Sequence, residues 1–195
     1  SDNCPLAANP QQEDVDHDGL GDACSPYVDR YQQMIFPAVA TTASLVYGHA
    51  LNAGTRVEEN LLLDVVEPID DLAPRRAVIV WIHDGGFTSG ARTAEPFVAL
   101  ATDFARRGYV TVSIDYRLYT VSPFLLQPAV RQAYEDAKAA VRWLRGNAQT
   151  YRIDADRIAI GGGAAGAITA LHAAYEESEG NSGSPGFSSA VGAVV

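Results

Sequence analysis

The residues best placed to do chemistry lie in a glycine-rich turn near the C-terminal end of the chain. The turn separates an apolar stretch at 157–160 from a second one at 167–174, and it reads Gly161-Gly162-Gly163-Ala164-Ala165-Gly166. It fits G-x-S-x-G, a sharp strand-to-helix turn that exposes a nucleophile at its centre. Ala164 occupies that centre, and alanine has no nucleophilic atom.

The same turn also fits the dinucleotide-binding motif G-x-G-x-x-G through Gly161, Gly163 and Gly166. That motif needs an acidic residue about 20 residues further on, where it binds a ribose. No acidic residue occurs at 180–189, and Glu176 and Glu177 come too early. The chain therefore favours the nucleophile turn over the dinucleotide site.

A second chemical feature directly follows the apolar run at 77–82. It reads His83-Asp84-Gly85-Gly86-Phe87. Glycines allow successive backbone N–H groups to turn toward one point, where they can stabilise a developing negative charge. We expect Gly85 and Gly86 to donate there, together with the N–H of Ala165. We expect His83 to brace the loop and the carboxylate of Asp84 to point away; a plain Gly-Gly turn is the alternative.

The first 25 residues contain aspartates in the order of a calcium-binding loop. They occupy positions 1, 3, 5 and 9, glycine holds the sixth position, and the seventh offers a backbone carbonyl. The residues at these positions are Asp14, Asp16, Asp18, Asp22, Gly19 and Leu20. Position 12 is Ser25 instead of glutamate, so we expect Asp2, Asn3 or Asn9 to complete the site. A hydrated acidic loop without metal is the alternative.

Between these features, apolar strand patterns alternate with helical ones. Strands are predicted at 43–47, 60–66, 77–82, 109–114, 157–160 and 190–195, and helices at 96–107, 132–145 and 167–174. This alternation predicts an α/β fold with a mostly parallel sheet and helices on both faces. Residues 25–42 are expected to link the calcium loop at 1–24 to a main domain at 43–195.

Charge and hydropathy argue against a nucleic-acid partner and against a membrane-spanning helix. The chain has 195 residues and a net charge of −10, which argues against binding to a phosphate backbone. No apolar run approaches the roughly 20 residues of a membrane-spanning helix. One main domain with a sizeable core is therefore expected.

The N-terminal segment resembles a single thrombospondin type 3 repeat. The resemblance rests on its Asp-Asn-Cys-Pro opening and its D-x-D-x-D-G-x-G-D-x-C close at 14–24. It implies a structural Ca²⁺, oxidised cysteines, and a secreted or periplasmic location. A bridge between Cys4 and Cys24 is expected, since a short loop without a core needs a covalent link. Pairing of either cysteine with another chain stays open.

The main domain resembles the α/β-hydrolase superfamily, close to bacterial carboxylesterases of the hormone-sensitive-lipase and feruloyl-esterase kinds. Besides the two glycine loops, the resemblance rests on segments 112–118, 136–144 and 153–160. It implies hydrolysis of a carboxylic ester by acyl transfer, with Ala164 at the position of the nucleophilic serine. It places Gly85, Gly86 and Ala165 in the oxyanion hole.

The catalytic acid and histidine of that superfamily should follow two further strands, which would lie after Val195. His172 is the only histidine after the turn, and its apolar surroundings predict a packed core residue. We therefore expect a second polypeptide, a C-terminal hydrolase fragment, to supply both groups to a small ester or acyl substrate. A truncated chain and a noncatalytic extracellular binding module are the alternatives.

Two further alternatives concern the chemistry itself. Ala164 is expected to be an engineered knock-out of the serine, because the surrounding glycines are retained; natural loss is the other reading. An amide or peptide hydrolase, or an acyltransferase, could use the same scaffold.

Overall fold

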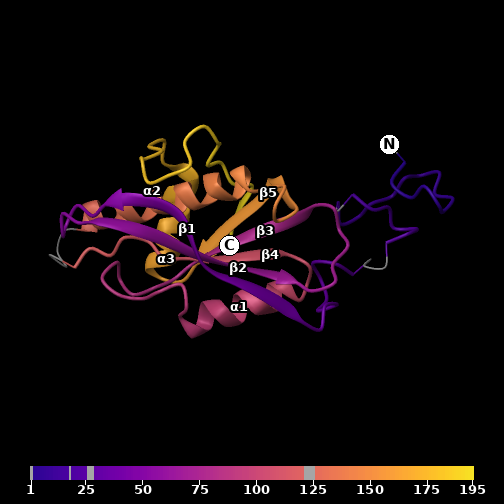
Figure 1. Cartoon of the computed structure of the whole chain (residues 1–195), viewed down its shortest axis with the longest axis horizontal. Coiled ribbons are helices and arrows are strands. Elements are labelled where there is room, and N and C mark those ends of the chain that lie inside the picture. The colour runs from indigo at the N-terminus through magenta and orange to yellow at the C-terminus, as the bar shows by residue number, and fades with distance from the viewer. Residues whose placement is uncertain (1, 18, 26–28, 121–125) are drawn as a thin grey trace.

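A computed structural model describes residues 2–17, 19–25, 29–120 and 126–195. One six-stranded sheet forms the centre of the molecule, and helices cover both of its faces (Figure 1). The predicted α/β architecture is confirmed. The strands are β1 (Val39–Leu51), β2 (Glu58–Pro68), β3 (Arg76–Ile82), β4 (Val110–Ile114), β5 (Ile153–Gly162) and β6 (Ala193–Val194).

The sheet is mixed: most of it is parallel, as predicted, but β2 runs opposite to the other strands. Its strand order is β1-β2-β4-β3-β5-β6, and β2 is antiparallel to both of its neighbours. The other pairings, β3 with β4, β3 with β5 and β5 with β6, are parallel. The short connection at 52–57 explains the difference, because strands joined by a tight turn can pair only antiparallel. The other five strands still share one direction, so their carboxyl ends meet at one edge.

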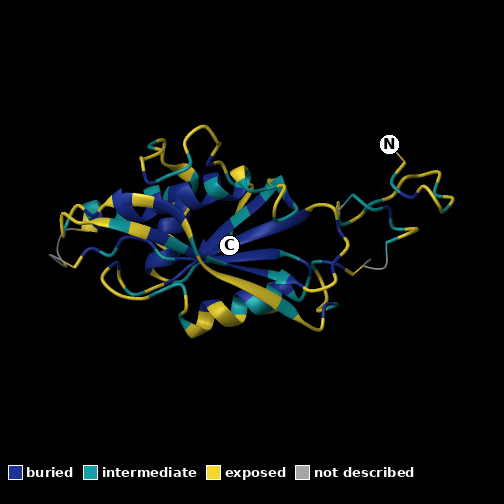
Figure 2. Cartoon of the chain, viewed as in Figure 1, coloured by how far each residue is buried: buried dark blue, intermediate teal, exposed yellow. Residues whose placement is uncertain are grey.

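The two central strands are buried along their full length. Every residue of β3 and β4 is buried, as Figure 2 shows for the middle of the sheet. Continuous apolar runs of this kind are expected where helices cover both faces. The register places Ile82 opposite both Ile114 of β4 and Gly162 of β5. Loops that follow β3 and β5 therefore leave the sheet side by side.

Helix α1 (Glu95–Ala105) packs on one face of the sheet, whereas α2 (Leu126–Gly146) and α3 (Ala165–Tyr175) pack on the other (Figure 1). The buried side of α1 consists of Phe97, Ala101 and Ala105. No helix in the described ranges is both long and apolar enough to cross a bilayer.

The N-terminal segment lies beside the sheet and is closed by a disulfide. Cys4 and Cys24 are bonded, as predicted. The expected linker at 25–42 is only partly a linker, because β1 begins at Val39 and pairs there with Pro68. Arg30, from the same stretch, is buried, and it forms an ion pair with Asp71.

Candidate active site

The glycine-rich turn connects β5 directly to α3. β5 ends at Gly162 and α3 begins at Ala165, which leaves Gly163 and Ala164 as the turn itself. Ala164 has φ 47° and ψ −110°, a conformation that costs a residue with a Cβ of order 1–3 kcal/mol. Ala164 is exposed, although Ala165 and Gly166 behind it are buried. The chain thus presents the side-chain position of residue 164 to solvent on a strained backbone.

Two glycines make this turn possible. A Cβ on Gly162 would lie 2.4 Å from the carbonyl oxygen of Ile82, and one on Gly166 would lie 2.1 Å from the same atom. Gly163 differs, since a Cβ there would meet only Phe97 at 3.4 Å. The close approach of α3 to the end of β3 therefore requires glycine at positions 162 and 166, but not at position 163.

The loop after β3 lies next to this turn. Gly85 has φ +107° and Gly86 has φ +62°, conformations that favour glycine. A Cβ on Gly85 would also lie 2.0 Å from the carbonyl oxygen of Ser89. The chain folds back there, and the amide groups of Thr88 and Ser89 each donate to the Gly85 carbonyl at 3.1 Å.

The three backbone N–H groups predicted to bind an oxyanion lie in these two loops. In the described part of the chain, the N–H groups of Gly85, Gly86 and Ala165 have no hydrogen-bond acceptor. Ala165 is the first residue of α3, where helical N–H groups lack internal partners and the helix dipole favours negative charge. Donors of this kind are suited to binding an oxyanion.

Two buried aromatic rings pack together at the loop that follows β3. The His83 ring stacks on Tyr116, with 4.3 Å between centroids, and both residues are buried. Burial raises the pKa of Tyr116, so its hydroxyl stays protonated near neutral pH. Asp84, in contrast, is exposed, so that solvent screens its charge. His83 thus lies where a loop brace was expected.

His172 is not the core residue that the sequence predicted. Its side chain is 40% exposed, stacks on Tyr134 and lies 3.2 Å from a carboxylate oxygen of Glu176. The outer surface of α3 is apolar, with Ile168 and Leu171 exposed, which made this face resemble a core stripe in the sequence. His172 follows Ala164 by eight residues, roughly 12 Å along a helix.

Three of the aspartates predicted to bind calcium in the N-terminal loop make contacts with other protein groups. Asp14 accepts a hydrogen bond from the N–H of Gly19 at 3.1 Å, and Asp22 accepts one from Val15 at 3.0 Å. Asp16 forms a 3.3 Å ion pair with Arg30. Asp18 lies outside the described residues.

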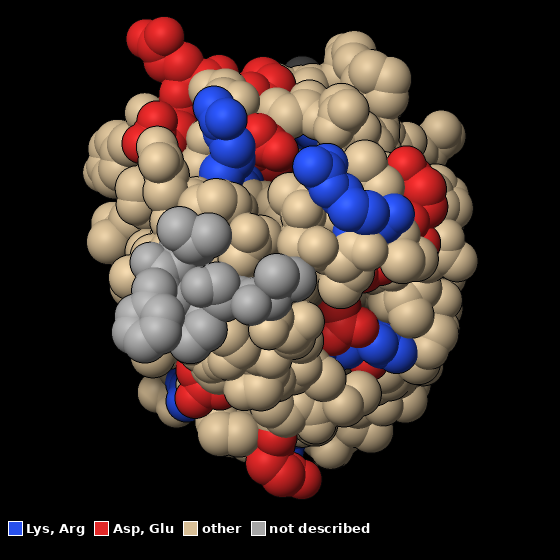
Figure 3. All heavy atoms as spheres, turned by 90° about the vertical axis from the view of Figure 1, so that its left-hand side faces the viewer, with Lys and Arg blue, Asp and Glu red and all other residues tan. Residues whose placement is uncertain are grey.

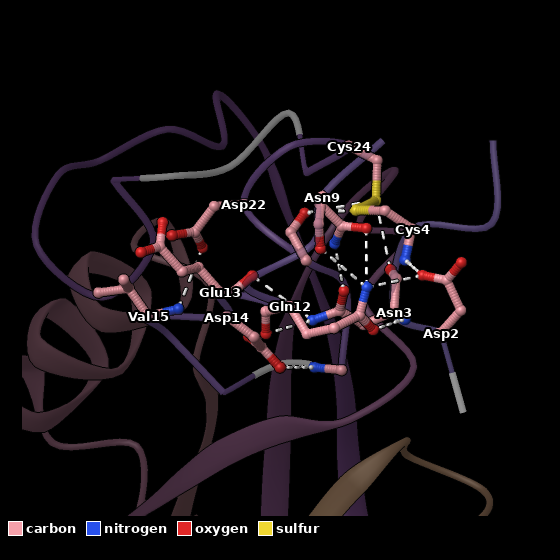
Figure 4. Close-up of a disulfide and its surroundings, with 12 residues drawn as sticks. Asp2, Asn3, Cys4, Asn9, Gln12, Glu13, Asp14, Val15, Asp22 and Cys24 are labelled. Carbon is pink, nitrogen blue, oxygen red and sulfur yellow. Dashed lines mark hydrogen bonds between the residues drawn. A yellow bond between two sulfur atoms is a disulfide. The ribbon is translucent and has the colours of Figure 1, made fainter. Parts of the chain in front are cut away.

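The described acidic side chains of this loop are not clustered as three metal ligands. Over 2–17 and 19–25, no group of three or more His, Cys, Asp or Glu side chains is assembled that could hold a metal ion. Asn3 and Asn9, which were expected to complete the site, hydrogen-bond to each other beside the disulfide, and Asp2 accepts from Gln12 there (Figure 4). Calcium binding through Asp14, Asp16, Asp18, Leu20 and Asp22 stays a prediction from the sequence.

Sequence reasoning missed the residues that hold the first loop in place. Tyr116, Thr88, Ser89 and Gly90 had no predicted role, although all four contact this loop. Gly90 offered a usable signal, because a third glycine within six residues indicates another close backbone contact.

The end of the molecule with the β1–β2 turn and the start of α2 is largely uncharged. Acidic and basic side chains are interspersed there among a larger area of other residues (Figure 3). A cavity of about 380 Å³ adjoins the first loop, and His83, Gly90, Asp115 and Tyr116 are among its lining residues. This volume lies at the small end of the range of ligand pockets.

Several known proteins with similar sequences or structures are named as esterases. The chain is 36% identical over 157 residues to "Esterase LipQ" of Mycobacterium tuberculosis, covering 80% of this chain and 34% of that protein. It is 33% identical over 113 residues to "Carboxylesterase 3" of Pongo abelii, covering 56% of this chain and 19% of that one. The chain therefore spans between about a fifth and a third of these relatives.

A solved structure of a thermophilic esterase from Thermogutta terrifontis, Est2 with propionate bound, has a TM-score of 0.59 and 28% identity. The match covers 83% of this chain and 54% of that one. The BD-FAE family model matches residues 63–193, which is more than half of the chain and includes both glycine loops. The chain belongs to the BD-FAE family, among the carboxylesterases of α/β-hydrolase fold.

Proposed function

We propose that this chain is the N-terminal part of a serine carboxylesterase in which Ala164 occupies the nucleophile position. The observation that carries the proposal is the backbone of Ala164, which is strained, exposed and set between two glycines that contact the end of β3. Strain of this kind persists where the surrounding structure enforces it, typically at functional sites. The retained turn supports an engineered or recent replacement of serine by alanine.

The proposed mechanism follows from the positions of the two loops. A serine hydroxyl at position 164 would attack the ester carbonyl carbon, and the carbonyl oxygen would take up negative charge. The N–H groups of Gly85, Gly86 and Ala165 would donate to that oxygen. A histidine would accept the serine proton and return it to the leaving alcohol, while an acid orients the histidine. Water would then release the acyl group by the same steps.

The histidine and the acid are proposed to come from outside residues 1–195, on a C-terminal hydrolase fragment. β6 pairs with β5 on one side in the described structure, and it lies at the end of the strand order. Helix α3, which contacts β6, has Ile168, Leu171 and Tyr175 as exposed apolar residues. An additional strand and its covering helix could pair with β6 and bury this face.

The proposed substrate is a small uncharged ester. The mixed, mainly uncharged surface at this end of the molecule favours no strongly charged ligand (Figure 3). The related Thermogutta terrifontis esterase has been solved with propionate and with butyrate bound. We infer that short acyl groups of this kind also suit the present site.

The test is to restore the nucleophile and to supply the missing segment. An Ala164→Ser chain combined with the C-terminal hydrolase fragment should hydrolyse p-nitrophenyl butyrate, whereas Ala164 protein with the same fragment should not. Gly163→Ser is the matched control, because a side chain fits at position 163 but lies one residue from the proposed nucleophile. Equal activity of both serine variants, or none in either folded complex, would refute the proposal.

A further inference from the structure

The three free N–H groups belong to peptide units that are fixed from the opposite side. A trans peptide is planar, so its C=O and N–H point in opposite directions. The N–H of Gly85 shares its peptide with the carbonyl of Asp84, the N–H of Gly86 with that of Gly85, and the N–H of Ala165 with that of Ala164. A hydrogen bond to each carbonyl therefore sets the direction of the N–H group behind it.

Each of these carbonyls has its own partner. The Ala164 carbonyl accepts from the N–H of Ile168 at 3.1 Å, which is an ordinary helical contact. The Gly85 carbonyl accepts from the amides and the hydroxyls of Thr88 and Ser89, at 3.1–3.3 Å. The Asp84 carbonyl differs, because its partners are side chains: the His83 ring, which is close to it, and the Tyr116 hydroxyl, which donates from the longer distance of 3.5 Å.

The contact between His83 and Asp84 is short and directional. Nδ1 of His83 lies 2.6 Å from the Asp84 carbonyl oxygen. A carbonyl can only accept, so Nδ1 must carry the proton in this contact. A histidine that merely filled space in the core would not require this tautomer.

The His83 ring is held on two sides. Tyr116 stacks on it at 14° between ring planes, and the Tyr116 hydroxyl donates to the His83 carbonyl at 3.3 Å. Gly90 approaches Nδ1 so closely that a Cβ on Gly90 would lie 2.4 Å from it. Only 1% of the residue's surface is exposed. The ring therefore has little freedom to leave the Asp84 carbonyl.

We propose that His83 is a positioning residue that aims the Gly85 N–H at the oxyanion by hydrogen-bonding the Asp84 carbonyl behind it. The inference rests on the proposed function of the two loops. In this arrangement Tyr116 and Gly90 hold the ring, and the Gly86 N–H is aimed separately through Thr88 and Ser89. The two neighbouring donors thus have independent supports.

The test is NMR spectroscopy of the isotope-labelled chain. In the unaltered protein, the ¹⁵N shifts of the His83 ring should show the Nδ1–H tautomer at neutral pH; an Nε2–H tautomer would overturn the proposal without any substitution. Residual dipolar couplings then report the direction of each N–H group. In His83→Leu the coupling of Gly85 should change, whereas those of Gly86 and Ala165 should not.

Matched variants separate positioning from folding. In His83→Asn, whose amide can reach the place of Nδ1, the Gly85 coupling should return toward its original value. Ser89→Ala should leave the Gly85 coupling unchanged. The proposal fails if His83→Leu leaves Gly85 unchanged, or if all three couplings change together. If His83→Leu does not fold, the ring tautomer still decides the matter.

A propionate titration connects this orientation to the site. Propionate should shift the Gly85, Gly86 and Ala165 amides, and His83→Leu should weaken its binding roughly 2- to 10-fold, as expected for one hydrogen bond. If propionate shifts none of these amides in the unaltered chain, the oxyanion role under the proposed function fails, while the tautomer and couplings still decide the positioning claim. Unchanged affinity in a His83→Leu protein that binds propionate would contradict the positioning claim.

Discussion

The turn at 161–166 and the loop at 2–25 are both tight, glycine-containing segments, but they are stabilised in different ways. The turn lies between β5 and α3, and its close contacts are made by backbone atoms against the end of β3. Among its described residues, the N-terminal loop buries no apolar side chain except that of Cys4. A disulfide and a set of side-chain hydrogen bonds centred on Asn3 and Gln12 hold it (Figure 4).

This difference shows where strained backbone can be maintained. Ala164 keeps an unfavourable conformation because two buried elements fix the chain on either side of it. The loop at 2–25 lacks close backbone packing of this kind. It depends on a covalent link, on polar contacts within the loop, and on Arg30 and Arg157, which bind its residue Asp16. Substitutions in the turn should therefore affect the whole domain, whereas those in the loop should act locally.

The largest effect is expected from a side chain at Gly166. Gly166→Ala places a Cβ against the Ile82 carbonyl, and neither backbone segment can move away without disturbing the sheet. We expect a loss of at least about 3 kcal/mol in the free energy of unfolding, at the upper end for overpacked sites, measured by urea denaturation. Gly163→Ala is the control and should cost less than about 1 kcal/mol. Equal losses would remove the distinction between the two positions.

Loss of the disulfide should cost a comparable free energy, but it should destabilise only the N-terminal loop. Cys4 and Cys24 are 20 residues apart, and closing a loop of this size contributes about 3 kcal/mol. In a Cys4→Ser, Cys24→Ser double variant we expect hydrogen exchange to accelerate within 2–25 and to stay unchanged in β3 and β4. Faster exchange throughout the sheet would contradict the separation of the two regions.

Calcium should order the N-terminal loop if Asp14, Asp16, Asp18, Leu20 and Asp22 bind it. Without the position-12 glutamate the site belongs with weak extracellular sites, which bind at about 10⁻⁴–10⁻³ M. At about 10 mM Ca²⁺ the loop should then gain about 1.4–2.7 kcal/mol, measured as slower hydrogen exchange over 14–22 than in EGTA. Asp14→Asn should abolish the gain and Glu13→Gln should keep it. No change with Ca²⁺ would favour the metal-free acidic loop.

The smallest effect should come from Glu179, in the loop that follows α3. Partial burial alone would raise the pKa of Glu179, but a hydrogen bond from Ser189 and the cations of Lys138 and Arg142 outweigh it and lower that pKa below 4.5. A lowered carboxyl pKa stabilises the fold above the unfolded value and loses this contribution as pH falls through the folded value. Amide exchange over 178–189 should therefore accelerate below pH 4.5, for a loss of roughly 0.2–1 kcal/mol. Glu179→Gln should remove this dependence and exposed Glu177→Gln should not; the same response in both variants would exclude Glu179 as its source.

Most of the fold could be predicted from apolar periodicity. Where the predicted element boundaries were wrong, the reason is physical. β1 begins before the predicted 43 because its first residues are mostly exposed and lack an apolar pattern. α2 begins at Leu126 rather than at 132, since a helix tolerates Pro128 in its first turn. The two glycine loops could be identified from the sequence because close backbone contacts require glycine. The hydrogen bond from His83 to Asp84 could not be found, since it depends on a ring orientation fixed by Tyr116, 33 residues away.

The most direct test of the central claim is covalent labelling at position 164. The Thermogutta terrifontis esterase 2 has been solved phosphorylated by paraoxon, which makes paraoxon a suitable probe. Ala164→Ser protein, combined with the C-terminal hydrolase fragment, should gain one diethylphosphoryl group, and peptide mass spectrometry should place it at position 164. The Gly163→Ser complex should remain unlabelled. A folded Ala164→Ser complex that gains no adduct, or gains one elsewhere, would contradict the assignment of this turn as the nucleophile site.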